Sequence, residues 1–129
     1  MILESDEKTS RWVLFSHIDA PDDLKKIHFD LLLEDVKFCR TWRLSEIPYL
    51  NGPFVEAIYS SPHKLEWLDV IEKAVSGDRG WAKRIKKGII FDSLPLVESS
   101  SLNLSATWDD KEVILEINRN GCRLRSPKN

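Results

Sequence analysis

The chain has 129 residues, of which 42% are hydrophobic, and a formal net charge of −2. This length favours one domain, residues 1–129, with a core that needs no disulfide bonds, and the charge does not indicate a uniformly basic nucleic-acid binder. No apolar run approaches the roughly 20 residues of a membrane-spanning helix, and the acidic start lacks the apolar core of a signal peptide. The two cysteines, Cys39 and Cys122, lie far apart without C-x-x-C spacing. We therefore expect a reduced, monomeric, cytoplasmic protein with no membrane partner.

Most of the chain is typical of short strands separated by turns, with one exception. In residues 64–75, apolar positions recur at helical spacing, which predicts one amphipathic helix that covers one end of the fold. The segment Asn118-Arg119-Asn120-Gly121 predicts a tight hairpin. The pattern thus predicts a mainly β fold, either a small antiparallel barrel or a sandwich, with one helix. The candidate strands are residues 11–17, 27–34, 36–44, 54–60, 86–92, 101–108, 111–118 and 121–126.

The segment from His28 to Glu34 reads His-Phe-Asp-Leu-Leu-Leu-Glu. Side chains alternate between the two faces of a strand, so His28 and Asp30 share one face with Leu32 and Glu34. His17, at the end of the preceding apolar run, supplies a second imidazole. Two histidines and one carboxylate suit a divalent metal and leave coordination positions open for catalysis. A half-solvated strand face without any metal remains the alternative at this point.

Three further segments follow in order. They are Phe38-Cys39-Arg40-Thr41-Trp42-Arg43-Leu44, then Pro62-His63-Lys64-Leu65-Glu66-Trp67, and then Gly77-Asp78-Arg79-Gly80 followed by a strand that ends at Asp92. With the His17 and His28 segments they resemble the 3'-phosphoesterase domain of bacterial DNA ligase D. That family reads approximately K-H-x-A-x-x-L-H-Y-D-F-R-L-E, then L-K-S-W-A-V, and later His-Pro-Leu-x-Tyr and a Gly-rich turn. The resemblance covers nearly the whole chain, which we expect to be a stand-alone form of this domain.

The resemblance implies a β-barrel and a function in DNA repair. His17, His28 and Asp30 would hold manganese or another divalent metal such as zinc, and His63 would be a catalytic group beside the phosphate. The implied reaction removes a ribonucleoside or a phosphate from a DNA 3' end or primer-template. It leaves a hydroxyl that a DNA ligase or polymerase can use.

Two positions depart from the family pattern. Leu32 replaces an arginine and Trp67 replaces a tyrosine, and both family residues lie on the phosphate side of the site. Leucine cannot supply the bidentate bonds of an arginine, so a catalytically impaired domain that binds metal and nucleic-acid ends is the alternative function. Arg40 and Arg43 lie on opposite faces of the next strand, so we expect one of them to point into the site, with Arg43 the candidate catalytic group.

Several other features are open to two interpretations. One basic stretch surrounds Trp81 and another ends the chain, and either could steer a polyanion or be ordinary solvated surface. Trp12, Trp42, Trp81 and Trp108 are more typical of core anchors than of base-stacking platforms. The Ala20–Lys26 link is longer than in the family and is expected to be a tolerated turn. An iron oxygenase could also use two histidines and a carboxylate, although no clamp for a 2-oxo acid is evident.

Overall fold

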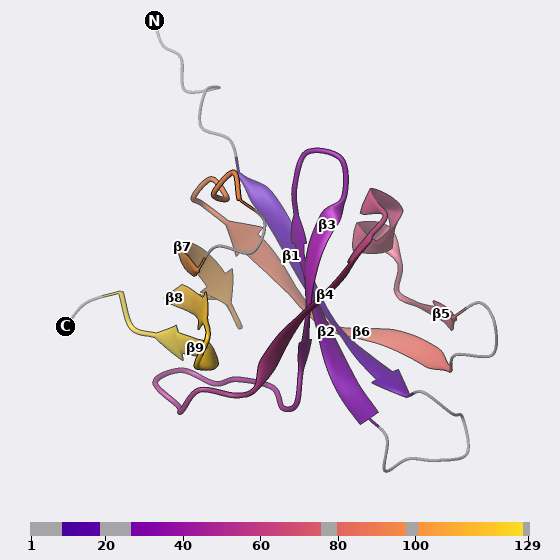
Figure 1. Cartoon of the computed structure of the whole chain (residues 1–129), viewed down its shortest axis with the longest axis horizontal. Coiled ribbons are helices and arrows are strands. Elements are labelled where there is room, and N and C mark those ends of the chain that lie inside the picture. Colours follow the sequence, from indigo (N-terminus) through magenta and orange to yellow (C-terminus); the bar gives the residue numbers. More distant parts are fainter. Residues whose placement is uncertain (1–8, 19–26, 76–79, 98–100, 128–129) are drawn as a thin grey trace, which may run out of the picture.

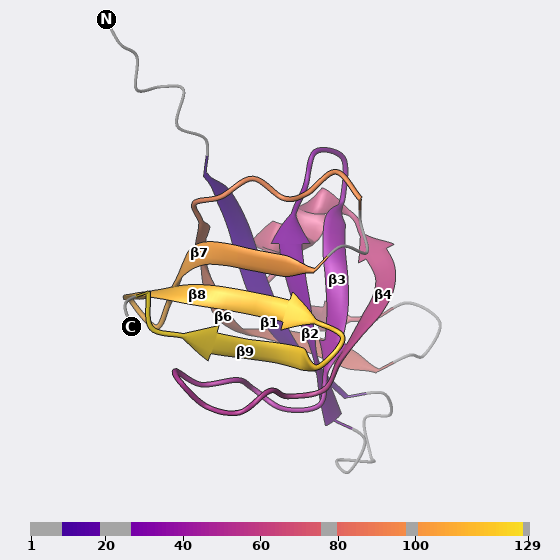
Figure 2. The same cartoon turned by 60° about the vertical axis from the view of Figure 1, so that its left-hand side comes forward.

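The computed structural model describes residues 9–18, 27–75, 80–97 and 101–127. Within them, nine strands form one antiparallel sheet in the order β4-β3-β2-β1-β6-β7-β8-β9, with β5 paired to β6. The sheet curls into a half-barrel, with β7, β8 and β9 facing β2 and β3 (Figures 1 and 2). The expected mainly β, antiparallel fold is thus confirmed. The strands are β1 Ser10–Ile18, β2 Ile27–Glu34, β3 Cys39–Leu44, β4 Ala57–His63, β5 Glu72–Ala74, β6 Trp81–Ile90, β7 Leu102–Trp108, β8 Lys111–Asn118 and β9 Gly121–Arg125.

The concave side of the sheet holds the main hydrophobic core. Every second residue of β1 and β2 points inward, and Trp12 stacks on Trp108 with ring centroids 4.2 Å apart. The Trp12 indole donates a hydrogen bond to the carbonyl of Thr107 over 2.9 Å. Gly88 is required beside it, because a Cβ there would lie 2.5 Å from the indole nitrogen. Trp12, Trp42 and Trp108 are all buried, which confirms them as core anchors.

A second, smaller apolar cluster lies on the opposite face of the sheet. It comprises Val13, Phe15, Leu32, Cys39, Leu68 and Ala82, with Leu65, Trp67, Val70 and Val75 packed against it. Val13 and Phe15 alternate along β1 with the inward-facing Trp12 and Leu14, so the two clusters follow the pleat of the strand. Burial of this outer face by the segment after β4 creates the setting for the candidate site.

The predicted helix over 64–75 is wrong. Residues Leu65–Asp69 form one short 3-10 helix, η2, and Glu72–Ala74 form β5 against β6. Leu68 is buried, but Ile71, the next apolar position at helical spacing, is 64% exposed. The carbonyl of Ile71 instead accepts a hydrogen bond from Arg84 over 2.8 Å. Pairing with the free edge of β6 therefore determines the conformation of this segment. Helical propensity is a weak determinant when tertiary partners compete.

Some strand boundaries also differ from the expectation. β6 begins five residues earlier than predicted, at Trp81, and Trp81 is 41% exposed, so its interpretation as a core anchor is wrong. β4 extends to His63 through Pro62, which an edge strand tolerates because its outer side needs no N–H donor. The 20–26 link and the Gly77–Arg79 part of the turn motif lie outside the described residues.

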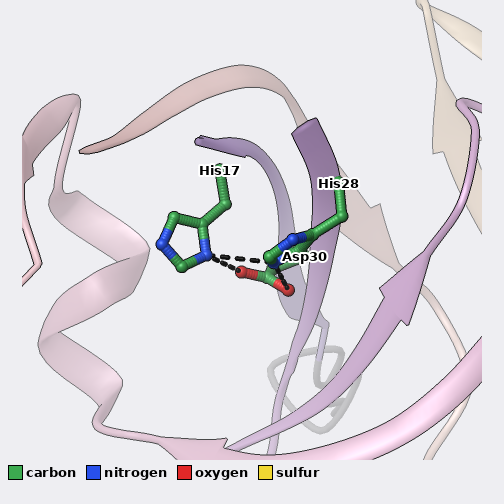
Figure 3. A group of neighbouring side chains, drawn as sticks. All are labelled: His17, His28 and Asp30. Atoms are coloured by element: carbon green, nitrogen blue, oxygen red, sulfur yellow. Dashed lines mark hydrogen bonds and ion pairs between the residues drawn. The ribbon is translucent and has the colours of Figure 1, made fainter. Parts of the chain in front are cut away.

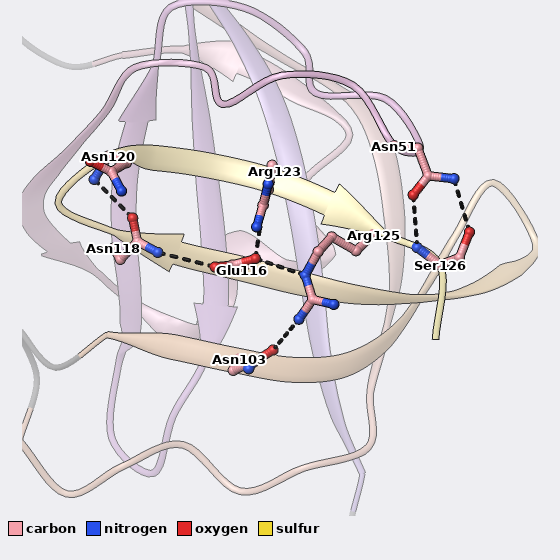
Figure 4. A network of polar contacts seen from close by, with 8 residues as sticks. All are labelled: Asn51, Asn103, Glu116, Asn118, Asn120, Arg123, Arg125 and Ser126. Atoms are coloured by element: carbon pink, nitrogen blue, oxygen red, sulfur yellow. Dashed lines mark hydrogen bonds and ion pairs between the residues drawn. The ribbon is translucent and has the colours of Figure 1, made fainter. Parts of the chain in front are cut away.

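The basic C-terminal stretch is part of a polar network on β7, β8 and β9 (Figure 4). The Glu116 carboxylate accepts hydrogen bonds from Arg123 and Arg125 over 2.9 and 2.8 Å, and Arg125 also donates to Asn103. The hydrogen bond from Arg123 opposes the effect of burial and, with that from Arg125, lowers the pKa of Glu116. These arginines therefore stabilise the packing of neighbouring strands. The expected Asn118–Gly121 hairpin connects β8 to β9.

Cys39 and Cys122 are both buried free thiols, as the spacing indicates. Burial raises the pKa of each thiol to about 12, so neither is poised to act as a nucleophile. Among the described residues, no helix is long and apolar enough to cross a membrane.

Candidate metal centre

The pairing of β1 with β2 brings the predicted metal ligands together. In this antiparallel pair His17 lies directly opposite His28, and Phe15 lies opposite Asp30. Partners in an antiparallel pair point to the same face, and residues two apart share a face, so all three polar side chains emerge on the outer face of the sheet. The alternation of side chains along one strand is enough to place His28 and Asp30 on the same face. The register of β1 against β2 is needed to bring His17 beside them.

Three ligand atoms converge at this point (Figure 3). His17 Nδ1 lies 3.0 Å from His28 Nε2, and each of these nitrogens lies 3.4 Å from one carboxylate oxygen of Asp30. Ligands held 2.0–2.2 Å from one zinc-sized ion would lie about 2.8–3.6 Å apart at adjacent tetrahedral or octahedral positions. The donor set and the spacing therefore fit a divalent metal.

The facing nitrogens need a proton or a metal ion between them. Two imidazole lone pairs 3.0 Å apart repel each other unless a proton or a metal ion separates them. The side chains are only 10–12% exposed, so bulk water screens this repulsion little. Burial by itself would raise the pKa of Asp30, but hydrogen bonds from His17 and His28 outweigh it and lower that pKa well below its usual range. The carboxylate is thus ionised and is available to a cation.

Two of the three residues, His17 and Asp30, border a groove of about 770 Å³ on the outer face. A smaller cavity of about 40 Å³ shares part of this lining and lies between Phe15, His17, Asp30, His63, Trp67, Val75 and Ala82. The rest of the groove is lined by polar and charged residues of β3, β4, η2, β5 and the link between β4 and η2, including Arg43, Ser60, Lys64, Glu66 and Lys73. Three cations against two carboxylates favour an anionic ligand over a cationic one.

His63 lies in the groove with the metal-ligand candidates, as the resemblance implies. An irregularity in the pairing of β3 with β4 leaves His63 opposite Cys39 and therefore on the outer face. Its Nδ1 lies 3.0 Å from the hydroxyl of Thr41 and 3.3 Å from the carbonyl of Ser61. Burial lowers the pKa of His63 and outweighs the nearby carboxylate of Asp30, which raises it. His63 is therefore predominantly neutral near pH 7.

Trp67 also lines the groove. Its ring lies edge-to-face with the imidazole of His63, with centroids 5.6 Å apart, and with the ring of Phe15 at 5.5 Å. The ammonium of Lys73 lies 4.9 Å from the centre of the same indole. Such cation–π and edge-to-face contacts hold the indole as one wall of the groove.

Leu32, which stands where the domain that the sequence resembles has an arginine, shares the face of His28 and Asp30 but does not reach the groove. It is fully buried in the outer apolar cluster, and it does not line the groove that contains Asp30 and His63. The outer face is closed over Leu32 by η2 and Leu68, so this position is structural here.

The two arginines of β3 have different surroundings. Arg43 is exposed, lies opposite Asp30 in the β2–β3 pair and lines the groove, as expected of a candidate phosphate contact. Arg40 is only 3% exposed and points to the inner face, where it donates to Asp35 over 2.7 Å and to the carbonyl of Pro95. The idea that Arg40 could serve the site is therefore wrong.

Sequence reasoning missed two groove residues, Lys73 and Lys64, and the buried Thr41 beside His63. Lys73 faces the groove because β5 pairs with β6, and Lys73, Ala82, His17 and His28 form one row across four strands. In the sequence, Lys64 and Thr41 are marked only by their position next to motif residues. No local pattern marks Lys73, because its place depends on the strand that forms where a helix was expected.

Comparison with known proteins does not assign the chain. No protein-family model matches it, and no curated protein matches it significantly. The convergence of His17, His28 and Asp30, with His63 in the same groove, is therefore the basis for a functional proposal.

Proposed function

We propose that the protein is a divalent-metal-dependent phosphoesterase that processes nucleic-acid 3' ends in DNA repair. The observation that carries the proposal is the convergence of His17, His28 and Asp30, whose ligand atoms all lie within 4.8 Å of one another. The resemblance to the ligase D phosphoesterase domain proposes the substrate, a DNA 3' end or primer-template that carries a ribonucleoside or phosphate. Manganese or zinc suits the proposed ligand set.

The groove supplies the other groups that such a reaction needs. A divalent ion held by the three residues supplies Lewis-acid chemistry that withdraws electrons from a phosphate oxygen. Arg43, Lys64 and Lys73 line the same groove and offer charge-assisted bonds to the remaining phosphate oxygens. His63 lies close enough to the site to exchange a proton with the reacting groups. Trp67 restricts access to one side of the groove.

A catalytically impaired domain of the same fold is the second candidate. The buried Leu32 leaves no guanidinium in place of the family arginine, and the exposed Arg43 is the nearest substitute along β3. In this alternative the protein binds a metal and nucleic-acid ends, and a DNA ligase or polymerase does the chemistry. We further expect a cytoplasmic monomer.

The two candidates differ in turnover. Purified protein is incubated with Mn²⁺ and a labelled primer-template that ends in one ribonucleotide or in a 3'-phosphate, with His28→Ala as the matched control. The phosphoesterase proposal predicts metal-dependent trimming that His28→Ala abolishes. Stoichiometric metal binding without trimming would instead support the binding domain, and dependence on iron(II) and oxygen would support an oxygenase.

A further inference from the structure

The hydroxyl of Thr41 lies at the centre of a short hydrogen-bond chain behind His63. Thr41 is fully buried on β3, 3.0 Å from Nδ1 of His63 and 3.3 Å from the carbonyl of Cys39. The carbonyl of Ser61 lies 3.3 Å from the same imidazole nitrogen. All of these contacts lie on one side of the ring.

The directions of these hydrogen bonds are fixed by the two carbonyls. A carbonyl only accepts, so the Thr41 hydroxyl donates its one proton to Cys39, and it can then only accept from His63. The Ser61 carbonyl likewise requires a donor at Nδ1 of His63. Both contacts therefore place the proton of the neutral imidazole on Nδ1, since one nitrogen's hydrogen bond determines the tautomer.

Nε2 is consequently the nitrogen that is left for the groove. No described residue forms a hydrogen bond with it, and His63 borders both the groove and the adjoining small cavity with His17 and Asp30. In the neutral ring this atom carries a lone pair, which repels a fully ionised phosphate oxygen but accepts a proton from a hydroxyl or water.

We propose that Thr41 is a positioning residue that holds His63 in the Nδ1–H tautomer and thereby makes Nε2 the proton acceptor of the groove. This inference rests on the proposed phosphoesterase function. It narrows the role of His63, because a neutral imidazole in this tautomer has no proton to donate at Nε2 to an incoming phosphate.

The step balances without a further reactant. Nε2 takes a proton from the attacking water while the water oxygen forms the new P–O bond. The resulting imidazolium retains its Nδ1–H bond to Thr41. It then returns the proton from Nε2 to the leaving oxygen as the old P–O bond breaks.

The tautomer is measured directly by long-range ¹H–¹⁵N NMR of the histidine side chains. Metal-free protein is used at about pH 8.5, well above the ordinary histidine pKa of about 6.5, and His63→Gln assigns the His63 signals. We expect the wild type to show a protonated Nδ1 and a bare Nε2. Thr41→Val, which removes only the hydroxyl, should shift part of the population to the Nε2–H form, whereas Thr41→Ser should retain the wild-type pattern.

Turnover provides the second readout. Thr41→Val should lower kcat about 10–100-fold, the size of effect seen when the partner that orients a functional imidazole is removed, and Thr41→Ser should restore it. KM should change far less than kcat, because the groove cations remain.

Two results would overturn the inference: an Nε2–H tautomer in the wild type, or a Thr41→Val variant with unchanged spectrum and kcat. If Thr41→Val does not fold, the His63 tautomer measured in the wild type and in Thr41→Ser still tests the inference. A wild type that trims no 3' end but shows Nδ1–H would reject the proposed function and leave the positioning role supported.

Discussion

His17 and His28 face each other across the β1–β2 pair, with His17 Nδ1 3.0 Å from His28 Nε2. Each of these nitrogens also approaches an oxygen of Asp30 to 3.4 Å. Two imidazole lone pairs that face each other beside a buried carboxylate repel, so a proton or a metal ion must lie between the two nitrogens.

Asp30→Asn should change how stability depends on pH. The pKa of Asp30 is lowered in the folded protein, so the unfolded chain binds the proton more readily. The stabilisation is therefore complete above the unfolded value of about 4, and it is lost as pH falls from there toward the lower folded pKa. Chemical denaturation of metal-free protein between pH 7 and pH 2 should show a shallower acid-induced loss in Asp30→Asn. Equal slopes for both proteins would contradict the described environment of Asp30.

Leu32→Arg, which introduces the arginine of the ligase D domain that the sequence resembles, should not raise activity. The side chain at this position is fully buried between β1, β3 and η2, so a guanidinium there is desolvated without a partner. We expect a loss of about 3 kcal/mol or more in the free energy of unfolding, comparable to or larger than that of Leu32→Ala. Urea denaturation measures both variants. A stable and more active Leu32→Arg protein would show that the outer face opens at this position.

Arg43→Ala and Arg40→Ala should separate function from stability. Arg43 is exposed beside the groove, so its removal should weaken the binding of a 3'-phosphorylated oligonucleotide about 10-fold. This is the equivalent of one charge-assisted hydrogen bond, and the free energy of unfolding should be nearly unchanged. Arg40 is buried and paired with Asp35, so its removal should cost on the order of 3 kcal/mol of stability. Fluorescence anisotropy and urea titrations report the two effects. Weaker binding in Arg40→Ala and lower stability in Arg43→Ala would mean that β3 presents its other face to the site.

Glu116→Gln should have a modest effect that is independent of the groove. The carboxylate pairs with two partly exposed arginines on the neighbouring strand, and exposed pairs contribute little. We expect a loss of about 0.5–1 kcal/mol of stability with unchanged metal affinity. Thermal unfolding with and without Mn²⁺ tests both the loss of stability and the unchanged metal affinity. An altered metal affinity would imply a connection between β8 and the site that the contacts do not provide.

Local patterns predicted β2 and β8 to the residue, because their alternation and flanking turns specify both ends. They failed over 64–75, where Leu65 and Leu68 suit a 3-10 turn as well as a helix. There the unpaired edge of β6 decided the conformation of Glu72–Ala74. Edge pairing is a long-range property, so no window of sequence contains it.

The candidate site likewise combines features that local patterns predict with features that depend on long-range pairing. The shared face of His28 and Asp30 follows from the two-residue period of a strand, whereas the position of His17 requires the register of β1 against β2. The resemblance proposed His63 as a catalytic group, and the structure places it in the groove, but the resemblance gave no indication of Thr41 behind it or of Lys73 across from it. The burial of Arg40 also depends on which strand face the curled sheet encloses.

The most direct test of the metal centre is a Mn²⁺ titration followed by electron paramagnetic resonance on the wild type, His28→Ala and His63→Ala. The structure predicts one Mn²⁺ per chain in the wild type, loss of that site in His28→Ala, and its retention in His63→Ala, since His63 is outside the converging triad. No stoichiometric binding by the wild type, or binding that His28→Ala leaves intact, would contradict the assignment of His17, His28 and Asp30 as metal ligands.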